Sequence, residues 1–599
     1  MKNNEIKFAK TLVIVTLFTA IVLVFQLSRM GVLDTTRGGQ AAREEPVSAG
    51  EPLEALTLET DTPLIGILAD GKDPNKDYLI EGTAQYLAHL DYQYEYIEDS
   101  KVLELQQYDM LLVFLTNFDD GAYMSAVMDY VRSGKFAYFP YLPFDRNSYS
   151  SNLRKIGVLE SQYENFSIDR IQDTGGVLGQ ADAVYEIPRT VDMSIKVRLA
   201  KDSELLLASE GLPLMWSLPY GEGNFLVSSS EFLASSESRG VLAYALYQGL
   251  FEPNDQAMVQ PFYNVSTTVL EDLVVPAEIR NSAILAQTGV DQDDFTLNRY
   301  FRLFKDISET YGDKISMSYT VDYSELFNEQ LPETLQRSQF RLYTAQVLAS
   351  GGEILTGGYS NHPLGLAGEL EGIGYFIPWK NEQRMQESIQ VAARYLEDVQ
   401  QGYTATSYIP PQGRIGSETL NRIAALFPDV ETVLNRYVIA YPDQLLGDFT
   451  TLNQGNQYLY TLTTENGAAQ WGTANAIHSL GISSFGFHSY SLLTDAVDFQ
   501  DFSTDVQRAY ELEQAYGLEK TTPAQAAERV RQYQNMTVHY AQDTQGFTYE
   551  IDLFIEGAAF LLRAEKTPVS EDAEIKSIGD MHIIYPKSPK GYIQWEESS

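Results

Sequence analysis

The sequence predicts an α/β protein in which one N-terminal transmembrane helix comes first and a small β domain comes last. Three observations lead to this expectation. An uncharged run of 18 residues, TLVIVTLFTAIVLVFQLS, separates Lys10 from Arg29. From Pro63 onward, short apolar segments alternate with amphipathic ones, which is typical of a parallel sheet covered by helices. Beyond Tyr533 the apolar period becomes two, as in half-buried strands of an antiparallel sheet.

The N-terminal run is long enough to cross a membrane. At about 1.5 Å per residue, a helix of this length nearly matches a hydrocarbon core of roughly 30 Å. Lys2, Lys7 and Lys10 precede the run, so the positive-inside rule predicts a cytoplasmic N-terminus and an exported remainder. A cleaved signal peptide is the alternative, but the run is long and Leu27–Met30 is a poor cleavage site. We therefore expect a single-pass protein of the cell membrane, with most of the chain extracytoplasmic.

Composition restricts the partners of the exported part. Residues 1–30 hold four of the 42 basic and one of the 82 acidic side chains, which leaves a formal charge of −43 on the remainder. This charge argues against nucleic acid, because phosphate binding needs a basic surface. A cationic partner is permitted, although solubility is the commoner reason for such acidity. The chain has no cysteine, which excludes disulfides, thiolate metal sites and a cysteine nucleophile.

The first expected domain covers residues 63–255, after a Gly-, Ala-, Glu- and Pro-rich flexible spacer. Strands are expected at residues 64–69, 93–97, 110–116, 136–140 and 223–228, and helices at residues 82–90, 123–133 and 239–250. This order resembles a flavodoxin-like or glutamine-amidotransferase-like domain. The catalytic version of that fold uses a cysteine nucleophile, so we expect a structural or recognition role here. Asp70 after the first strand is expected in a plain turn rather than a ligand site.

The second domain, residues 256–515, carries five segments that resemble the polysaccharide deacetylase (NodB-like) family, in the order of that family. They are Thr267–Asp272 (TTVLED, beside the family's TFDDG), Lys314–Val321 (KISMSYTV), Gly351–Pro363 (GGEILTGGYSNHP, beside GHEIGNHTYSHP), Tyr408–Gly413 (YIPPQG, beside FRPPYG) and Ile482–Tyr490 (ISSFGFHSY). Helices are expected at residues 331–350, 382–399 and 417–427. The resemblance implies a deacetylase-like (β/α) barrel.

The same resemblance implies a metal-dependent carbohydrate N-deacetylase, with a divalent metal such as zinc held by one aspartate and two histidines. Carried over by position, Asp272 and His362 are the metal ligands present, and the third ligand falls on Gly358. Glu271 takes the place of the base aspartate, and glutamate can still accept a proton. His488 matches the late histidine that protonates the departing amine.

Two departures leave the activity open. Two ligands would hold zinc poorly, and Ile409 stands where the family has an arginine that orients the base. One hypothesis is an N-deacetylase with an altered site, and the other is a non-catalytic binding or assembly module. Glycoside hydrolysis by paired carboxylates is a third possibility that only Glu271 and Asp272 support. Tyr359 and Tyr408 are expected beside the cleft as substrate-binding rings that stack on sugars, with core packing as the alternative.

The whole exported part is similar to the deacetylase component encoded in Pel-type exopolysaccharide loci. This similarity implies a bacterial protein that acts on a polysaccharide rich in N-acetylhexosamine, together with synthase or export proteins. Thr522–Pro523 predicts the start of a helix that ends near Tyr533, and strands are expected at residues 559–563, 582–585 and 592–595. The expected divisions are a cytoplasmic tail (1–10), an anchor (11–28), a linker (29–62), the two α/β domains (63–255 and 256–515), a linker helix (516–535) and a β-sandwich-like domain (536–599).

Overall fold

The computed structural model describes residues 63–70, 77–98, 102, 104–118, 121–143, 151–162, 166–191, 194–276, 282–370, 376–436, 451–452, 457–462, 469–488 and 499–596. The chain from Thr60 to Ser599 forms one compact unit. The expected anchor and linker, residues 11–62, lie outside the described residues. Among the helices that are described, none combines the length and the hydropathy needed to span a membrane.

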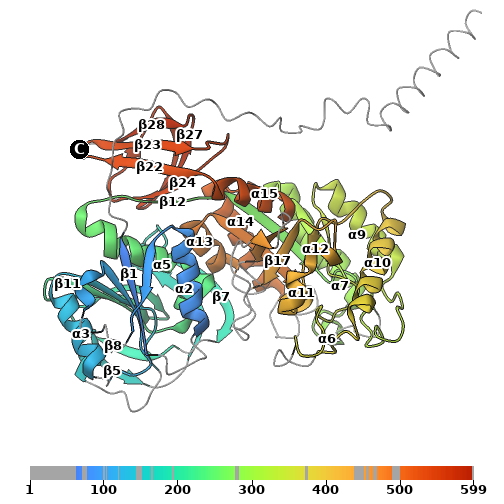
Figure 1. Ribbon diagram of the computed structural model, residues 1–599, viewed down its shortest axis with the longest axis horizontal. Helices are drawn as coiled ribbons and strands as arrows, with labels where there is room; N and C mark the ends of the chain where they lie inside the picture. Colours follow the sequence, from blue (N-terminus) through green and yellow to red (C-terminus); the bar gives the residue numbers. More distant parts are fainter. Residues whose placement is uncertain are drawn as a thin grey trace, which may run out of the picture. The chain divides into compact units, whose positions relative to one another are not determined.

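The N-terminal α/β part is built on one mixed sheet, drawn from blue to green in Figure 1. Its parallel half has the order β2 (Gln93–Tyr96), β1 (Leu64–Ala69), β3 (Met110–Phe114), β4 (Phe136–Phe139) and β11 (Gly223–Ser228). The antiparallel half continues with β10 (Leu212–Tyr220), β9 (Glu204–Ser209), β6 (Ser167–Asp173) and β7 (Ala183–Val191). The five predicted strands are confirmed as the parallel half, whereas the antiparallel half was not predicted beyond β11.

Three predicted helices of this part are also present. They are α2 (Asp77–His89), α3 (Gly121–Arg132) and α5 (Arg239–Leu246), and a π-helical turn (Tyr247–Phe251) follows the last of them. Helix α2 begins five residues before the predicted start, with an acidic side chain in its first turn, where the helix dipole favours negative charge. A short helix α4 (Ser151–Lys155) and the antiparallel pair β5 (Val158–Gln162) and β8 (Lys196–Leu199) complete the part.

The second part is a curled parallel half-barrel. The chain order of its parallel strands is β13 (Val265–Glu271), β14 (Ile315–Tyr319), β15 (Ile354–Thr356), β16 (Ser407–Tyr408), β17 (Thr432–Arg436), β19 (Gln457–Leu462) and β20 (Ile482–His488). In space β20 pairs with β13, so the last strand lies beside the first, and the sheet runs through β14, β15, β16 and β17 to β19. Every one of these pairings is parallel, which places the carboxyl ends of the strands at one edge.

Helices follow most of these strands along the chain, and several are labelled in Figure 1. They are α6 (Ser282–Thr288), α7 (Gln292–Phe295), α8 (Phe301–Tyr311), α9 (Arg337–Ala349), α10 (Glu382–Val399), α11 (Ser417–Asn421), α12 (Ile423–Leu426), α13 (Ala469–Ser479) and α14 (Phe499–Tyr516). Helix α10 has the predicted bounds. The helix expected from residue 331 begins only at Arg337, because Pro332 and the residues after it form a hydrogen-bonded loop. The helix expected over residues 417–427 is interrupted at Arg422.

The C-terminal part contains two antiparallel sheets, as the period-two pattern predicted. One has the order β22 (Thr537–Gln542), β23 (Gly546–Asp552), β28 (Lys590–Trp595) and β25 (Pro568–Val569). The other has the order β12 (Met258–Pro261), β24 (Phe560–Arg563), β27 (Met581–Pro586) and β26 (Ala573–Ile578). Apolar side chains of both sheets share one core that includes Phe547, Ile551, Phe560 and Ile584. Strand β12 precedes the half-barrel in sequence, so the expected second domain, residues 256–515, includes a strand whose sheet partners lie in the expected domain 536–599.

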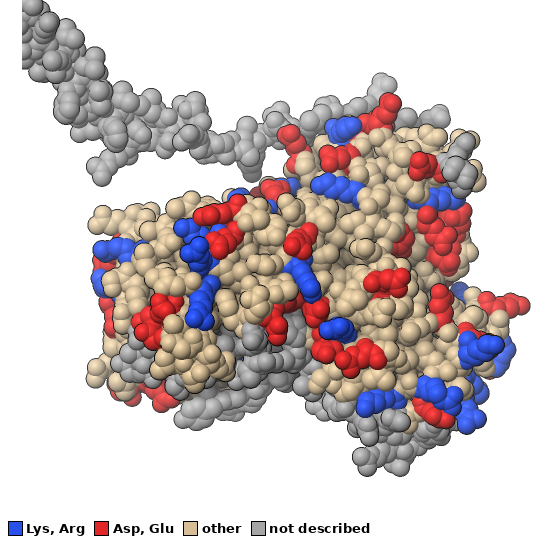
Figure 2. Space-filling model, turned by 180° about the vertical axis from the view of Figure 1, so that it is seen from behind, with Lys and Arg blue, Asp and Glu red and all other residues tan. Residues whose placement is uncertain are grey.

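Helix α15 (Pro523–Gln534) connects the half-barrel to these sheets. The side chain of Thr522 accepts from the backbone of Gln525, whose side chain in turn accepts from the Thr522 backbone. This capping box and the proline at the first helical position confirm the predicted helix start. On the surface seen in Figure 2, acidic and basic side chains both occur across the face, so the negative charge of the chain is not gathered there into one patch.

Candidate functional site

Two neighbouring strand ends bring three of the predicted site residues together. Glu271 ends β13 and His488 ends β20, and the parallel register places these two residues side by side. The Nδ1 atom of His488 lies 3.2 Å from Oδ2 of Asp272, and its Nε2 atom lies 3.4 Å from Oε1 of Glu271. All three side chains are largely buried. An imidazole can donate from both nitrogens only when it is protonated, so this arrangement suits an imidazolium between two carboxylates.

The backbone of Asp272 is held in the left-handed region, with φ of 54°. A non-glycine residue in this conformation is uncommon, and such residues often occur where a side chain must point in a set direction. Here the direction is fixed by Tyr323, whose hydroxyl donates to Oδ1 of Asp272 at 2.6 Å. Both carboxylate oxygens of Asp272 therefore have hydrogen-bonding partners within the site.

Two tyrosines near Asp272, one of them in contact with it, were missed from the sequence. Tyr323 follows the strand β14 by four residues, at the same carboxyl edge of the sheet, and this position was the only available signal. Tyr300 is fully buried, and burial together with the nearby charge of Asp272 raises its pKa well above the ordinary value. The site thus combines two carboxylates, one imidazole and the phenolic hydroxyl of Tyr323.

His362, the other expected metal ligand, lies in an aromatic environment. Its Nδ1 atom accepts a hydrogen bond from the backbone of Ile377 at 3.3 Å, and its ring centre lies 5.2 Å from that of Phe327. Burial lowers the pKa of His362, an effect that nearby acidic side chains, including that of Asp322, partly oppose. Within the described residues its hydrogen bonds go to Ile377 and Ser360, and none joins it to Asp272.

The residues present do not fit the three-ligand metal site that the deacetylase resemblance implies. In the described part of the chain, no group of three or more His, Cys, Asp or Glu side chains is placed to hold a metal ion. Gly358, at the third ligand position, has φ of 88°, a conformation that a histidine would rarely adopt. Ile409, at the arginine position, is 2% exposed and packs in the apolar core.

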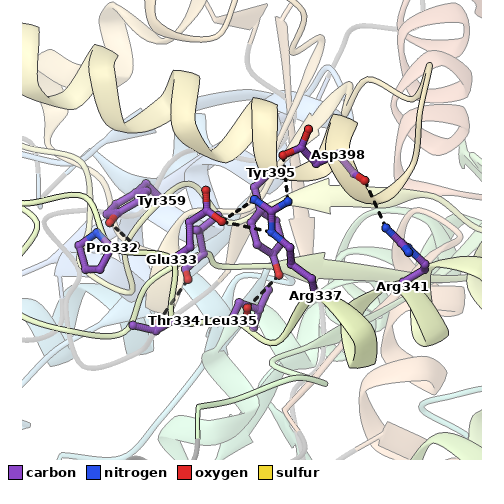
Figure 3. A network of polar contacts seen from close by, with 10 residues as sticks. Pro332, Glu333, Thr334, Leu335, Arg337, Arg341, Tyr359, Tyr395 and Asp398 are labelled. Atoms are coloured by element: carbon purple, nitrogen blue, oxygen red, sulfur yellow. Dashed lines mark hydrogen bonds and ion pairs between the residues drawn. The ribbon is translucent and has the colours of Figure 1, made fainter.

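The two expected sugar-stacking rings are both buried. Tyr359 is 0% exposed, and its hydroxyl donates to the carbonyl of Pro332 at 2.5 Å. Figure 3 shows that it belongs to a network that fastens the loop before α9. In this network Arg337 pairs with Glu333 and Asp398, and the hydroxyl of Tyr395 donates to the carbonyl of Leu335. Tyr359 therefore holds the loop before α9 through its hydrogen bond to Pro332, and neither face of its ring is exposed.

Tyr408 is also 0% exposed, and its ring stacks on Phe427 with centroids 4.7 Å apart. Its hydroxyl is buried and has no hydrogen-bond partner among the described residues, and burial raises its pKa. The expectation that both rings lie open beside a cleft is thus wrong for this structure, because each ring fills a core position. Core packing was the alternative interpretation of both tyrosines.

Comparison with known proteins places the chain in a family. The family described as "Uncharacterised protein conserved in bacteria (DUF2194)" matches residues 181–583, which include the half-barrel and most of the C-terminal sheets. The chain belongs to the DUF2194 family. Among curated proteins none matches it.

Solved structures resemble this DUF2194 protein over about a third of its length. A ThuA-like protein from Bacteroides uniformis ATCC 8492 shares 11% identity with a TM-score of 0.24, covering 34% of this chain and 96% of that one. A β-galactosidase from Bacillus circulans sp. alkalophilus shares 15% identity with a TM-score of 0.23, covering 33% of each chain. An exo-β-1,4-mannosidase from Opitutaceae bacterium strain TAV5 shares 11% identity with a TM-score of 0.24, covering 32% of this chain and 36% of that one. At these TM-scores and identities, the activities of those proteins imply no activity for the DUF2194 chain.

Proposed function

We propose that this protein is a membrane-anchored, extracytoplasmic component of bacterial exopolysaccharide synthesis or modification. Its half-barrel holds N-acetylhexosamine units of the polymer at the carboxyl edge of the sheet. The observation that carries the proposal is the position of His488 between Asp272 and Glu271 on adjacent strand ends. Charged and neutral hydrogen-bonding groups in one largely buried site suit the hydroxyl and acetamido groups of a sugar.

Binding without metal-dependent hydrolysis is the function that this geometry supports best. Gly358 and Ile409 stand where the deacetylase resemblance implies a histidine ligand and an arginine. The left-handed backbone of Gly358 and the core position of Ile409 show that neither position serves that role here. The carboxylate–imidazole–carboxylate group remains, and it can position hydroxyl groups and exchange protons with them. The same retained group favours a second candidate, an N-deacetylase whose metal is held by a different ligand set.

One experiment separates these two candidates. The full chain is purified in detergent, and its binding of N-acetylglucosamine and N-acetylgalactosamine oligomers is measured together with bound metal and released acetate. We expect saturable binding that weakens about tenfold or more in His488→Ala, because hydrogen bonds to charged groups are lost. Tyr395→Phe is the matched control, because it loses one buried hydrogen bond elsewhere in the half-barrel.

Three other results would contradict binding without hydrolysis at this edge. Near-stoichiometric zinc that is lost in Asp272→Ala, together with acetate release, would establish the deacetylase instead. Absence of both oligomer binding and acetate release from the folded chain would contradict both candidates. Retention of polymer that is unaffected by His488→Ala would place the binding site outside the half-barrel edge.

A further inference from the structure

A fully buried carboxylate lies one residue before Tyr323, the tyrosine that contacts Asp272. Asp322 is 0% exposed and follows β14 at the carboxyl edge of the half-barrel. Its backbone N–H donates to the carbonyl of Tyr359 at 2.8 Å, and it forms a parallel bridge with Ser360. The backbone of Asp322 is thus fixed by a continuation of the pairing between β14 and β15, while its side chain is free to serve another purpose.

Two hydroxyl groups that flank Tyr323 donate to the carboxylate of Asp322. Oγ of Ser324 lies 2.7 Å from Oδ2, and Oγ1 of Thr334 lies 3.1 Å from Oδ1. Burial raises the pKa of Asp322, and the hydrogen bonds from these two residues partly oppose that effect. A buried carboxylate is costly, but hydrogen bonds to a charged acceptor are stronger than those to a neutral one. The carboxylate therefore sets the direction in which both hydroxyls donate.

The hydroxyl of Thr334 joins Asp322 to the backbone of Tyr323. Thr334 lies in the loop before α9 (Figure 3), and its own N–H donates to the carbonyl of Val321 at 3.1 Å. Its Oγ1 accepts from the N–H of Tyr323 at 3.2 Å. A hydroxyl has one hydrogen and two lone pairs, so donation to Asp322 leaves a lone pair for Tyr323. The carbonyl of Val321, at 3.4 Å from Oγ1, is farther away and uncharged, so it competes poorly for the hydrogen.

The position of Tyr323 in turn affects where the carboxylate of Asp272 points. The Tyr323 hydroxyl donates to Oδ1 at 2.6 Å, while Oδ2 lies 3.2 Å from Nδ1 of His488. Because Asp272 has a left-handed backbone, its conformation depends on such surrounding contacts. A shift of the Tyr323 backbone would therefore move this carboxylate relative to the imidazole. Hydrogen bonds thus link five residues in order: Asp322, Thr334, Tyr323, Asp272 and His488.

We propose that Asp322 and Thr334 are positioning residues of the half-barrel site, which fix Tyr323 and through it the carboxylate of Asp272. Both act through Tyr323 rather than on the bound sugar. The inference rests on the proposed function for its ligand, an N-acetylhexosamine unit. The orientation of Asp272, however, is a property of the protein without sugar, and it can be measured separately.

A double-mutant cycle tests the proposal through binding of N-acetylglucosamine oligomers to the full chain in detergent. Thr334→Val is similar in shape but loses both hydrogen bonds, and it should weaken binding about fivefold. Thr334→Ser keeps the hydroxyl and should bind as the wild type does. In a Tyr323→Phe background, Thr334→Val should have no further effect, because the hydroxyl through which it acts is absent. Losses that multiply in the double variant would show that Thr334 acts independently of Tyr323 and would overturn the proposal.

Imidazole NMR of the full chain gives a second readout that needs no sugar. The chain has six histidines, and the signal of His488 is the one that is absent in His488→Ala. Thr334→Val and Asp322→Ala should each shift this signal, because the carboxylate of Asp272 moves relative to the ring. Since Asp322→Ala also empties a buried position, the smaller change in Thr334→Val decides the outcome. An unchanged His488 signal in Thr334→Val would overturn the proposal.

Thr344→Val is the matched control for both measurements. The hydroxyl of Thr344 is also buried, and it donates within α9 to the carbonyl of Phe340 at 2.8 Å. This variant should leave the His488 signal and oligomer binding unchanged, and a shift equal to that of Thr334→Val would count against a specific role of Thr334. Failure of the wild type to bind oligomers would contradict the proposed function alone, because the NMR comparison still decides whether Asp322 and Thr334 position Asp272.

Discussion

Nη2 of the Arg563 guanidinium lies 2.9 Å from Nδ1 of His478. Arginine only donates hydrogen bonds, so Nδ1 is the acceptor and His478 carries its proton on Nε2, which faces the hydroxyl of Tyr516 at 3.1 Å. The same Nη2 atom donates to the carbonyl of Val177 at 3.3 Å, and Asp580 lies 3.8 Å from Nε. One buried arginine of the C-terminal sheets thus contacts both α/β parts of the chain.

Removal of this guanidinium should destabilise the whole unit. We expect Arg563→Met to lower the unfolding free energy by about 3 kcal/mol, because Asp580 loses its counter-charge and His478 loses a donor. Thermal and urea unfolding measure the effect. Arg302→Met is the control, since that arginine is exposed and its ion pair with Asp306 should contribute about 1 kcal/mol or less. Equal effects of the two substitutions would show that the buried contacts contribute little.

The turn that faces His478 offers a matched pair of glycine substitutions. Gly179 has φ of 84°, and a Cβ there would lie 2.7 Å from Cε1 of His478 and 3.0 Å from the carbonyl oxygen of Ile578. Gly211 has φ of 78°, and no atom of the described residues lies within 4 Å of the corresponding position. Gly211→Ala should cost about 1 kcal/mol from backbone strain alone. Gly179→Ala should cost a further 1–3 kcal/mol or so, because it adds overpacking. Similar unfolding midpoints for the two variants would contradict this.

Buried histidines should make the fold sensitive to acid. Burial lowers the pKa of His582 from 6.5 to about 4, and its ring contacts Ser577 and the carbonyl of Ala564. The unfolded chain takes up this proton at higher pH than the folded chain does. The stability that His582 contributes is therefore complete above pH 6.5 and is lost as the pH falls to about 4, by about 3 kcal/mol in total. The unfolding free energies of the wild type and His582→Asn should converge on acidification, and imidazole NMR should show the low titration. If the unfolding free energies of the two proteins keep a constant difference as the pH falls, His582 is not the source of the acid sensitivity.

At the half-barrel edge, the hydroxyl of Tyr323 should matter for binding rather than for folding. Tyr323→Phe removes the 2.6 Å hydrogen bond to Asp272. We expect oligosaccharide binding to weaken by a factor of about five to ten, equivalent to about 1 kcal/mol. Tyr395→Phe removes a 3.0 Å hydrogen bond to the carbonyl of Leu335 in the same half-barrel and should leave binding unchanged. A loss of binding shared by both variants would indicate a general loss of structure.

The elements that were predicted well are those whose apolar pattern is strong over a whole segment. Strand β1 and helix α10 have the expected bounds, because each is a continuous apolar run or a long amphipathic stripe with clear ends. Strands β6 and β7 were not predicted, because short half-buried strands with many polar residues give little contrast with loops. The helix expected from residue 331 failed at Pro332, where backbone sterics outweigh an otherwise helical composition.

The site was predicted only through the positions that match the deacetylase motifs. Glu271 and His488 were expected in one site because of that resemblance, and the structure places them side by side on parallel neighbouring strands. Tyr323 could not be identified, since its role depends on a loop conformation after β14. Tyr359 could not be assigned either, because a tyrosine ring serves equally in a core or on a sugar. The left-handed backbone of Gly358 is likewise invisible in a sequence that shows only a glycine.

Strand β12 pairs with β24, so Met258–Pro261 is joined to Phe560–Arg563 across nearly the whole half-barrel sequence. During synthesis the first of these segments emerges some 300 residues before its partner. Until then it is an unpaired apolar edge, a state that favours aggregation or transient protection by other proteins. The arrival of Phe560–Arg563 therefore decides when β12 is paired, and a truncation that removes this segment should leave β12 without its partner strand.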